Sequence, residues 1–500
     1  MAIANPSITP IAIKMAPSTL DLFVLTFNCA KRLINAAVFA SHLQAAFKQN
    51  ATALPEVVVF SLQEVSPLAS AFIGGSFISP YLLAFEEALN LAAAAAAAQD
   101  ANTNGRDETV TVAPTASTGP VRPYTLVRAR NVGMTAIMLF ARDPAALRDI
   151  QEAEVGFGAN NMGNKGAVAL RATFGRGEDE TEVTFVATHL AAMEWNLRKR
   201  NENWGSIMQG LAFEDPKAVV RESPALTAAA GEEAAADNER SRLLAAEEDD
   251  AQSKAQQARL QDLSVFRPSA HLFVAGDLNY RISAESPPPK APFPSLDDAS
   301  EHHYPRFFET DQLTAEREAG RTLHGMSEAE VRFPPTYKYH VLDGEDDKGG
   351  VNWKFASHRW PSWTDRVLYL DVPGANEGVA SAARIDVRAY DALPVLRTSD
   401  HRPVFLRVDV PMLSPAQMRE ALAAAVASAG GTDDPRAEPP VDVDVDTWAA
   451  RAAARRSEKW AGSTMYLWTT RAGAYAIAGL LGLGIAGYLW VGRSQTSSAA

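Results

Sequence analysis

Six apolar runs in this chain each begin or end at a polar residue suited to metal-assisted chemistry on phosphate. Runs rich in β-branched residues are typical of strands. A strand that carries a carboxylate, amide or imidazole at its end commonly builds a site, and hard divalent cations prefer oxygen ligands. The polar residues at these ends are Asn28, Glu64, His189, Asp277 with Asn279, Asp365, and Asp400 with His401.

The carboxylate and amide residues predict a cation and a positioned water, which hydrolysis of a phosphate ester requires. Glu64 follows one buried run and Asn28 ends another. Mg²⁺ commonly takes one or two carboxylates and keeps several waters, so we expect it at these two residues. Asp277 is expected to activate the attacking water. Asn279, two residues further along an extended segment, projects to the same side.

The histidines complete the expected chemistry. A cationic His401, oriented by Asp365, can stabilise the charge that develops on a phosphoryl group. His189 can act in the same way from another side. Each motif alone has an ordinary explanation, since Gly-Asp-Leu-Asn suits a hairpin turn and Thr-His suits the end of a strand. The order and spacing of all the motifs together favour a site.

The strands that must position these residues are interrupted by segments of different composition. We predict a catalytic domain over residues 20–412 with two flexible insertions. The insertion near 91–120 begins as an alanine run at the end of a helix, and the one near 214–261 is rich in alanine and charged residues. A helical and acidic linker is expected over 413–465.

An uncharged run from Ala472 to Gly492 follows the linker. About 21 residues at ~1.5 Å each cover roughly 30 Å, the thickness of a hydrocarbon core. Basic residues are concentrated before the run, which predicts that the bulk of the chain lies in the cytosol. We expect a transmembrane tail anchor over 466–493, in the endoplasmic reticulum or, alternatively, the mitochondrial outer membrane. A buried core helix is the competing explanation, disfavoured by the acidic linker.

Composition limits the partners. The formal net charge is −13, and an acidic chain suits sequence-independent nucleic-acid binding poorly because that binding depends on Lys and Arg contacts to phosphate. We therefore expect no nucleic-acid partner. The single cysteine, Cys29, excludes an internal disulfide and is expected to be a small buried residue. A monomeric catalytic domain is expected.

Nine motifs, taken in order, resemble the catalytic domain of the inositol polyphosphate 5-phosphatases, a branch of the endonuclease/exonuclease/phosphatase superfamily related to DNase I. The resemblance extends from about Asp21 to about Val410 and is most specific in GDLNYR and PSWTDR. Together with the apolar C-terminal run, it is similar to tail-anchored fungal members of the endoplasmic reticulum. The motifs are TFN, LQEV, NMGNKGAVAL, THLAA, GDLNYRI, DQL, FPPTYKY, PSWTDRVLY and TSDHRPV.

The resemblance implies a four-layer α/β sandwich of the DNase I type, with two mixed β-sheets face to face and helices outside. It implies the same cation and water residues as above, and a His401–Asp365 pair at the scissile phosphate, completed by Asp400 and His189. It also implies residues that bind the substrate. These are Tyr337 and Lys338 at the 4-phosphate, Asn164 and Lys165 near the 1-phosphate, and Arg281 and Arg366 in support of the phosphate pocket.

The cations in this part of the sequence agree with a polyanionic substrate, because Lys165, Lys338, Arg359 and Arg366 can each pair with phosphate. One departure concerns the stretch from Ser357 to Arg359, where family members often have Lys-x-Arg. One expected 4-phosphate cation is missing there, which leaves the preferred phosphorylation pattern open.

We expect Mg²⁺-dependent hydrolysis of the 5-phosphate of phosphatidylinositol 4,5-bisphosphate, and of related phosphoinositides or inositol phosphates, at a cytosolic membrane face. A flexible linker of about 50 residues would span roughly 40 Å and let the domain reach lipids in its own membrane. The alternatives are a membrane-tethered phosphoinositide-binding protein without turnover, and another phosphodiesterase of the superfamily.

Overall fold

Two mixed β-sheets form the centre of the computed structural model, which describes residues 18–104, 122–177, 179–222, 252–346, 350–375, 383–428 and 432–497. One sheet has the strand order β12-β13-β1-β2-β4-β3 and the other β11-β8-β7-β6-β5. In each sheet one central pair is parallel, β1 with β2 and β7 with β8, and the other pairs are antiparallel. The strands are β1 (Thr19–Asn28), β2 (Val57–Gln63), β3 (Thr125–Val132), β4 (Thr135–Ala141), β5 (Leu147–Gly156), β6 (Gly166–Arg176), β7 (Asp179–His189), β8 (Ala270–Asp277), β11 (Asp365–Leu370), β12 (Asp386–Ala392) and β13 (Val404–Pro411).

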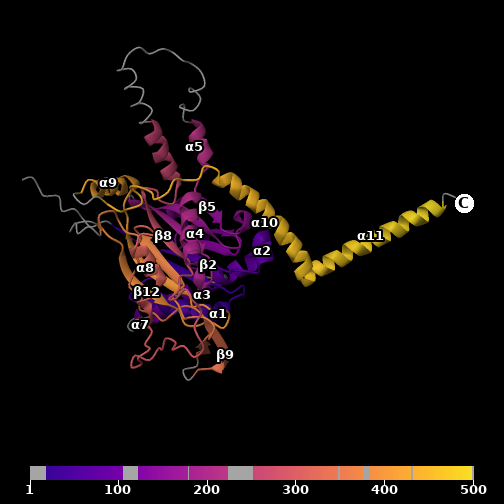
Figure 1. Cartoon of the computed structure of the whole chain (residues 1–500), viewed down its shortest axis with the longest axis horizontal. Helices are drawn as coiled ribbons and strands as arrows, with labels where there is room; N and C mark the ends of the chain where they lie inside the picture. The colour runs from indigo at the N-terminus through magenta and orange to yellow at the C-terminus, as the bar shows by residue number, and fades with distance from the viewer. Residues whose placement is uncertain are drawn as a thin grey trace, which may run out of the picture.

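The sheets pack face to face, and helices cover their outer faces (Figure 1). Alternate residues of β1 show why this happens: Leu22 and Val24 enter the core between the sheets, while Phe23 and Leu25 enter the core under the helices. A strand with both faces apolar must be buried on both sides. The predicted four-layer sandwich is therefore confirmed.

Helices α1 (Ala36–Lys48) and α3 (Ser79–Asn104) cover the first sheet, and α4 (Leu197–Gly210) covers the second. Asn35 caps α1, because its side chain accepts a hydrogen bond from the backbone N–H of Val38. The remaining elements of the domain are short. They are α2 (Leu68–Ile73), α5 (Pro216–Glu222), α7 (Pro305–Phe308), α8 (Gln312–Glu318), the hairpin β9 (Tyr339–Glu345) and β10 (Val351–Phe355), and a helix over 252–263.

The two predicted insertions are in part helical. Helix α3 continues through the alanine run to Asn104, and residues 105–121 lie outside the described chain. The second insertion begins with α5 and ends in the helix over 252–263, and residues 223–251 lie outside the described chain. Both runs combine good helix formers with an apolar side that can pack, which explains the helical parts.

The segment expected to be a flexible linker is largely packed on the domain. It contains α9 (Pro415–Val426) and α10 (Thr447–Thr469), and residues before α10 and in its first turn donate to the domain backbone. Arg436 is buried and donates to the carbonyl of Ala270, and Trp448 donates to the carbonyl of Ala212 at 3.0 Å. The expectation of a free tether of about 50 residues is therefore wrong, because side chains that composition assigns to solvent find partners on the domain.

Helix α11 (Arg471–Ser497) contains the apolar run and projects away from the globular part (Figure 1). Its described apolar side chains are exposed, with Leu480 at 68% and Leu483 at 73%. Among the described residues, the one helical stretch that meets both length and apolarity criteria for a membrane span is Ser79–Ala98 of α3. Because Phe85 and Leu89 of that stretch are buried in the core, α3 is a core helix.

A buried histidine on β8 predicts acid sensitivity of the fold. Burial and the nearby Arg436 lower the pKa of His271 to about 3, although its Nε2 hydrogen bonds to the carbonyl of Pro411 at 3.0 Å. Below pH ~6.5 the His271 imidazole binds a proton in the unfolded chain but stays neutral in the folded chain, so the free energy of unfolding falls as the pH decreases. We expect His271 to cost about 2 kcal/mol of stability between pH 7 and pH 4.5.

Urea unfolding of the wild type and His271→Gln at these two pH values measures this cost. The glutamine variant should show a shallower pH dependence, since a neutral amide can keep the bond to Pro411. Parallel pH profiles for the two proteins would contradict the assignment.

Candidate active site

The strand register brings the predicted residues to one edge of the two sheets. In the parallel pair β1–β2, Asn28 is opposite Gln63, so Glu64 lies one residue beyond and beside Asn28. In the second sheet, Asp277 is opposite both His189 and Asp365. The sequence predicts that all six strand ends build one site. Sheet pairing aligns five of them, and His401 of the sixth lies 2.9 Å from Asp365.

The chain turns sharply where these strands end. Glu64 and Asn279 have left-handed backbones, with φ of 45° and 58°. Asparagine tolerates this region, whereas for glutamate it costs free energy and persists only where the surroundings impose it. The turn after β2 therefore directs Glu64 into the site at some cost to backbone stability, which is common at functional positions.

Asp277 is the centre of the site. Its Oδ2 accepts a hydrogen bond from Asn28 Nδ2 at 2.9 Å, and it lies 3.2 Å from His189 Nε2 and 4.0 Å from His401 Nε2. Its Oδ1 accepts the backbone N–H of Asn279 at 3.1 Å. Burial alone would raise the pKa of Asp277, but the two histidines and Lys165 hold it below its usual range. Asp277 is therefore an ionised acceptor.

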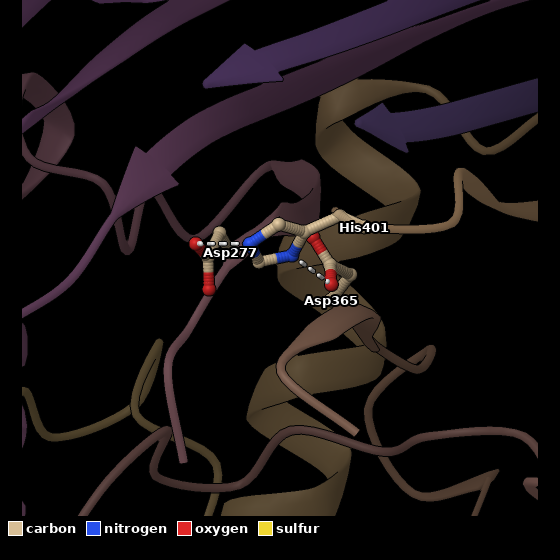
Figure 2. A group of neighbouring side chains, drawn as sticks. All are labelled: Asp277, Asp365 and His401. Carbon is tan, nitrogen blue, oxygen red and sulfur yellow. Dashed lines mark hydrogen bonds and ion pairs between the residues drawn. The ribbon is translucent and has the colours of Figure 1, made fainter. Parts of the chain in front are cut away.

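His401 lies between two carboxylates (Figure 2). Its Nδ1 is 2.9 Å from Asp365 Oδ2, and its Nε2 is directed toward Asp277. The same Asp365 oxygen accepts hydrogen bonds from the hydroxyls of Thr336 at 2.7 Å and Thr364 at 2.8 Å. Burial would lower the pKa of His401, but Asp365, Asp277 and Asp400 raise it to about 9. The imidazole is therefore protonated at neutral pH, as expected.

The charge of His401 predicts the alkaline limb of the pH profile. If phosphate hydrolysis requires the imidazolium, kcat/KM falls as the pH rises through about 9. Asp365→Asn removes the neighbour that raises the pKa of His401 most, so the alkaline limb should move to lower pH by about one unit or more. Initial rates between pH 6 and 10 measure the alkaline limb in the wild type and in Asp365→Asn. An unchanged alkaline limb in Asp365→Asn would rule out His401 as the group that titrates.

The oxygen donors fit a divalent cation at Glu64 and Asn28. The Glu64 carboxylate is partly exposed and pairs with Lys31 at 3.0 Å, so a cation can reach it from solvent. Asp277, Asp365 and His401 also offer ligand atoms within 4.8 Å of one another. That cluster suits a cation poorly, because a protonated His401 has no free lone pair. The oxygen donors of Glu64 and Asn28 therefore suit a hard divalent cation better than that cluster does.

Cations and an aromatic ring surround the carboxylates. Lys165 contacts His189, and burial lowers the pKa of Lys165 to about 8. Lys338 donates to Asp400 at 2.6 Å, which keeps Asp400 at the site. Arg281 lies 4.4 Å from the centroid of Tyr337, and that ring is 4.5 Å from the ring of His401. The structure thus places together Arg281, Tyr337, Lys338 and Lys165, with Asp400 and His189.

Three predicted substrate residues are placed differently. Arg366 is fully buried and donates to Glu328 at 2.6 and 2.7 Å and to Asp311 at 2.9 Å, so its N–H groups serve two carboxylates rather than a phosphate. The assignment of Arg366 as a substrate-binding residue is corrected to a structural one. Asn164 is exposed on the loop before β6, and Arg359 pairs with a buried glutamate at 3.4 Å.

Sequence reasoning missed several residues that support the site. Ser399 donates to the carbonyl of Asn28 at 2.6 Å and accepts the backbone N–H of His401, so it ties the segment before β13 to the end of the neighbouring strand β1. Glu194 is 1% exposed and is the partner of Arg359. Thr336 and Thr364, whose hydroxyls donate to Asp365, could have been found from their positions. They directly precede Tyr337 and Asp365 in the FPPTYKY and PSWTDRVLY motifs.

Comparison with known proteins decides the family. Residues 25–407 match the sequence profile of Endonuclease/Exonuclease/phosphatase family 2, which is more than half of the chain. The chain belongs to this family. The matched range includes every candidate catalytic and metal-binding residue and ends before α9, α10 and α11.

Curated relatives in the family are similar to this chain over part of their length. Synaptojanin of Caenorhabditis elegans and polyphosphatidylinositol phosphatase INP53 of Saccharomyces cerevisiae are each 26% identical over 285 residues, 56% of the chain. The chain spans about a fifth of their length (19%). A solved inositol polyphosphate 5-phosphatase domain of spsynaptojanin, in complex with inositol (1,4)-bisphosphate and calcium ion, covers 81% of the chain with a TM-score of 0.49 and 20% identity.

Proposed function

We propose that this protein is a Mg²⁺-dependent phosphoinositide 5-phosphatase that acts on phosphatidylinositol 4,5-bisphosphate at a cytosolic membrane face. The observation that carries the proposal is the buried arrangement of Asp277, His401 and Asp365, with His189 and Asn28 against the same Asp277 oxygen. Similarity to relatives named as phosphoinositide phosphatases supports the substrate class.

The residues divide the work of hydrolysis. Asp277 accepts a hydrogen bond from the attacking water and orients it, and Asn279 is held beside it by the backbone bond to Asp277. His401 donates to the phosphoryl oxygens as charge builds up, because Asp365 holds its Nδ1 and leaves Nε2 free to face the substrate. Water adds to phosphorus, the bond to the 5-oxygen breaks, and inorganic phosphate leaves.

A cation at Glu64 and Asn28 would neutralise charge on the phosphoryl oxygens. The remaining phosphates of a polyanionic headgroup need cations as well. Lys165, Lys338 and Arg281 lie around the carboxylates and can supply them. The ion pair of Lys338 with Asp400 would have to open or be shared when a phosphate binds.

We extend the proposal to the membrane. Helix α11 would span the bilayer of the endoplasmic reticulum, with the mitochondrial outer membrane as the alternative, and would leave the catalytic domain in the cytosol. The uncharged run, the flanking arginines and the exposed apolar side chains of α11 support this. Microscopy of the tagged full chain against markers of both organelles tests the location.

The direct test is release of inorganic phosphate by the full chain from vesicles that contain phosphatidylinositol 4,5-bisphosphate, with and without Mg²⁺. We expect 5-position hydrolysis that chelation abolishes and Mg²⁺ restores. Soluble inositol phosphates, sphingomyelin and duplex DNA complete the panel. Binding of the lipid without release would favour the non-catalytic alternative, and cleavage of a diester would favour another phosphodiesterase.

A further inference from the structure

Helix α10 contacts the loop that presents Lys165, which we call the lysine loop (Phe157–Lys165). Glu458 of α10 is fully buried, and its Oε1 accepts the backbone N–H of Gly163 at 2.7 Å. Arg451 donates to both oxygens of Glu458, at 2.7 and 2.9 Å, and to the carbonyl of Asn161 at 3.2 Å. Two buried charged residues of one helix therefore hold the loop backbone.

The lysine loop has a conformation that needs such support. Asn160 and Asn161 have left-handed backbones, with φ of 53° and 58°. Gly163 lies so close to Gly133 that a Cβ on Gly133 would stand 1.7 Å from the Gly163 oxygen. The loop is thus pressed against the β3–β4 turn on one side and held by α10 on the other.

The contact continues toward the floor of the site. The carbonyl of Gly163 accepts the N–H of Met134 at 3.3 Å, and the carbonyl of Met134 accepts the N–H of Val65 at 3.1 Å. Val65 directly follows Glu64, and Lys165 lies two residues after Gly163. The backbone N–H and carbonyl of one residue, Gly163, therefore connect α10 with residues on two sides of the site.

We propose that α10 is part of the substrate site, with Glu458 and Arg451 as positioning residues that hold the lysine loop so that Lys165 reaches the phosphates of the substrate. The substrate named here rests on the proposed function, whereas the coupling of α10 to the loop does not. The family match ends at residue 407, so this support comes from a part of the chain outside the family domain. Glu458 touches no reacting atom and acts only through the loop.

The kinetic test uses Glu458→Gln in the full chain, which keeps the side-chain volume and removes the charge that pairs with Arg451. On vesicles with phosphatidylinositol 4,5-bisphosphate, the KM of the variant should be about tenfold above that of the wild type, because one charge-assisted hydrogen bond is worth about that factor. Its kcat should stay within about twofold of the wild-type value. Lys459→Gln, on the exposed side of the same helix, is the matched control and should change neither.

A double-mutant cycle separates positioning from general weakening of the fold. In a Lys165→Met background, Glu458→Gln should add less than about twofold to KM, because the group it positions is gone. Additive effects in the two backgrounds, or a fall in melting temperature without a change in KM, would overturn the proposal.

Hydrogen exchange of the wild type tests the coupling without activity. If α10 and the lysine loop open together, the Gly163 amide and the amides of α10 share one opening free energy and one urea dependence. Rapid exchange at Gly163 while α10 stays protected would overturn the proposal, even where Glu458→Gln fails to fold. A shared opening in a protein that hydrolyses no phosphoinositide would contradict the proposed function and leave the coupling intact.

Discussion

Asp277→Asn should lower kcat for phosphate release about 10³-fold while the protein stays folded. The carboxylate accepts from Asn28, lies 3.2 Å from His189 and faces His401, so it contacts the end of the first sheet and both histidines. Asparagine has the same shape but no charge. It removes the acceptor for the attacking water and lowers the pKa of His401 at the same time.

Initial rates at saturating lipid measure this effect, and circular dichroism verifies the fold. Asp386→Asn is the matched control, because Asp386 is an exposed aspartate at the start of β12. It should keep full activity. A loss of less than tenfold in Asp277→Asn would show that the water is activated elsewhere, and the assignment of the site would have to change.

Arg366→Met should reduce the free energy of unfolding by about 3–5 kcal/mol, the second large effect that we expect. The substitution removes the buried cation that Asp311 and Glu328 share, and these carboxylates have 0% and 4% side-chain exposure. Among the described residues, Glu328 then keeps only the partly exposed Arg317 as a cation partner, at 3.1 Å. Uncompensated buried charges cost far more than the loss of a surface pair.

Denaturant unfolding with Arg388→Met as the control tests this prediction. Arg388 pairs with Asp409 in a similar way but is 32% exposed, so its loss should cost below about 1 kcal/mol. If Arg366→Met instead left the stability unchanged and abolished substrate binding, the structural role would be wrong. Arg366 would then be a residue of the phosphate pocket, as the sequence predicted.

The sequence predicts the strand ends well for a physical reason. Apolar runs such as the one before Asn28 are buried on both faces, so they form central strands, and their pairing aligns the polar residues that follow. The sequence motifs alone are therefore enough to predict which polar residues gather at the site. The partners of Asp365 were missed because a threonine hydroxyl gives no signal in the sequence beyond its position.

Buried arginines explain most of the remaining failures. Arginine is usually a surface residue, so composition assigns Arg366, Arg436 and Arg451 to solvent or ligand. Arg366 pairs with Asp311 and Glu328, which are 55 and 38 residues away, and Arg451 pairs with Glu154, which is 297 residues away. No local pattern indicates such pairs. Arg436 has a nearby carboxylate, Asp434, but it also donates to the distant carbonyl of Ala270. The same assumption, that arginine lies at the surface, led to the prediction that the alanine- and arginine-rich segment of α10 is a solvated linker.

The packing of α10 limits how far the catalytic domain can move from α11. From Glu458 to the start of α11 the chain is helical for about 13 residues, or about 20 Å, and then bends at Thr470, which has an extended backbone (φ −115°, ψ 151°). Where α11 spans a bilayer, the bend at Thr470, and not a long flexible linker, connects the catalytic domain to the membrane helix. The catalytic domain is then confined to the leaflet that holds it, and an apposed membrane a few tens of ångströms away lies beyond its reach.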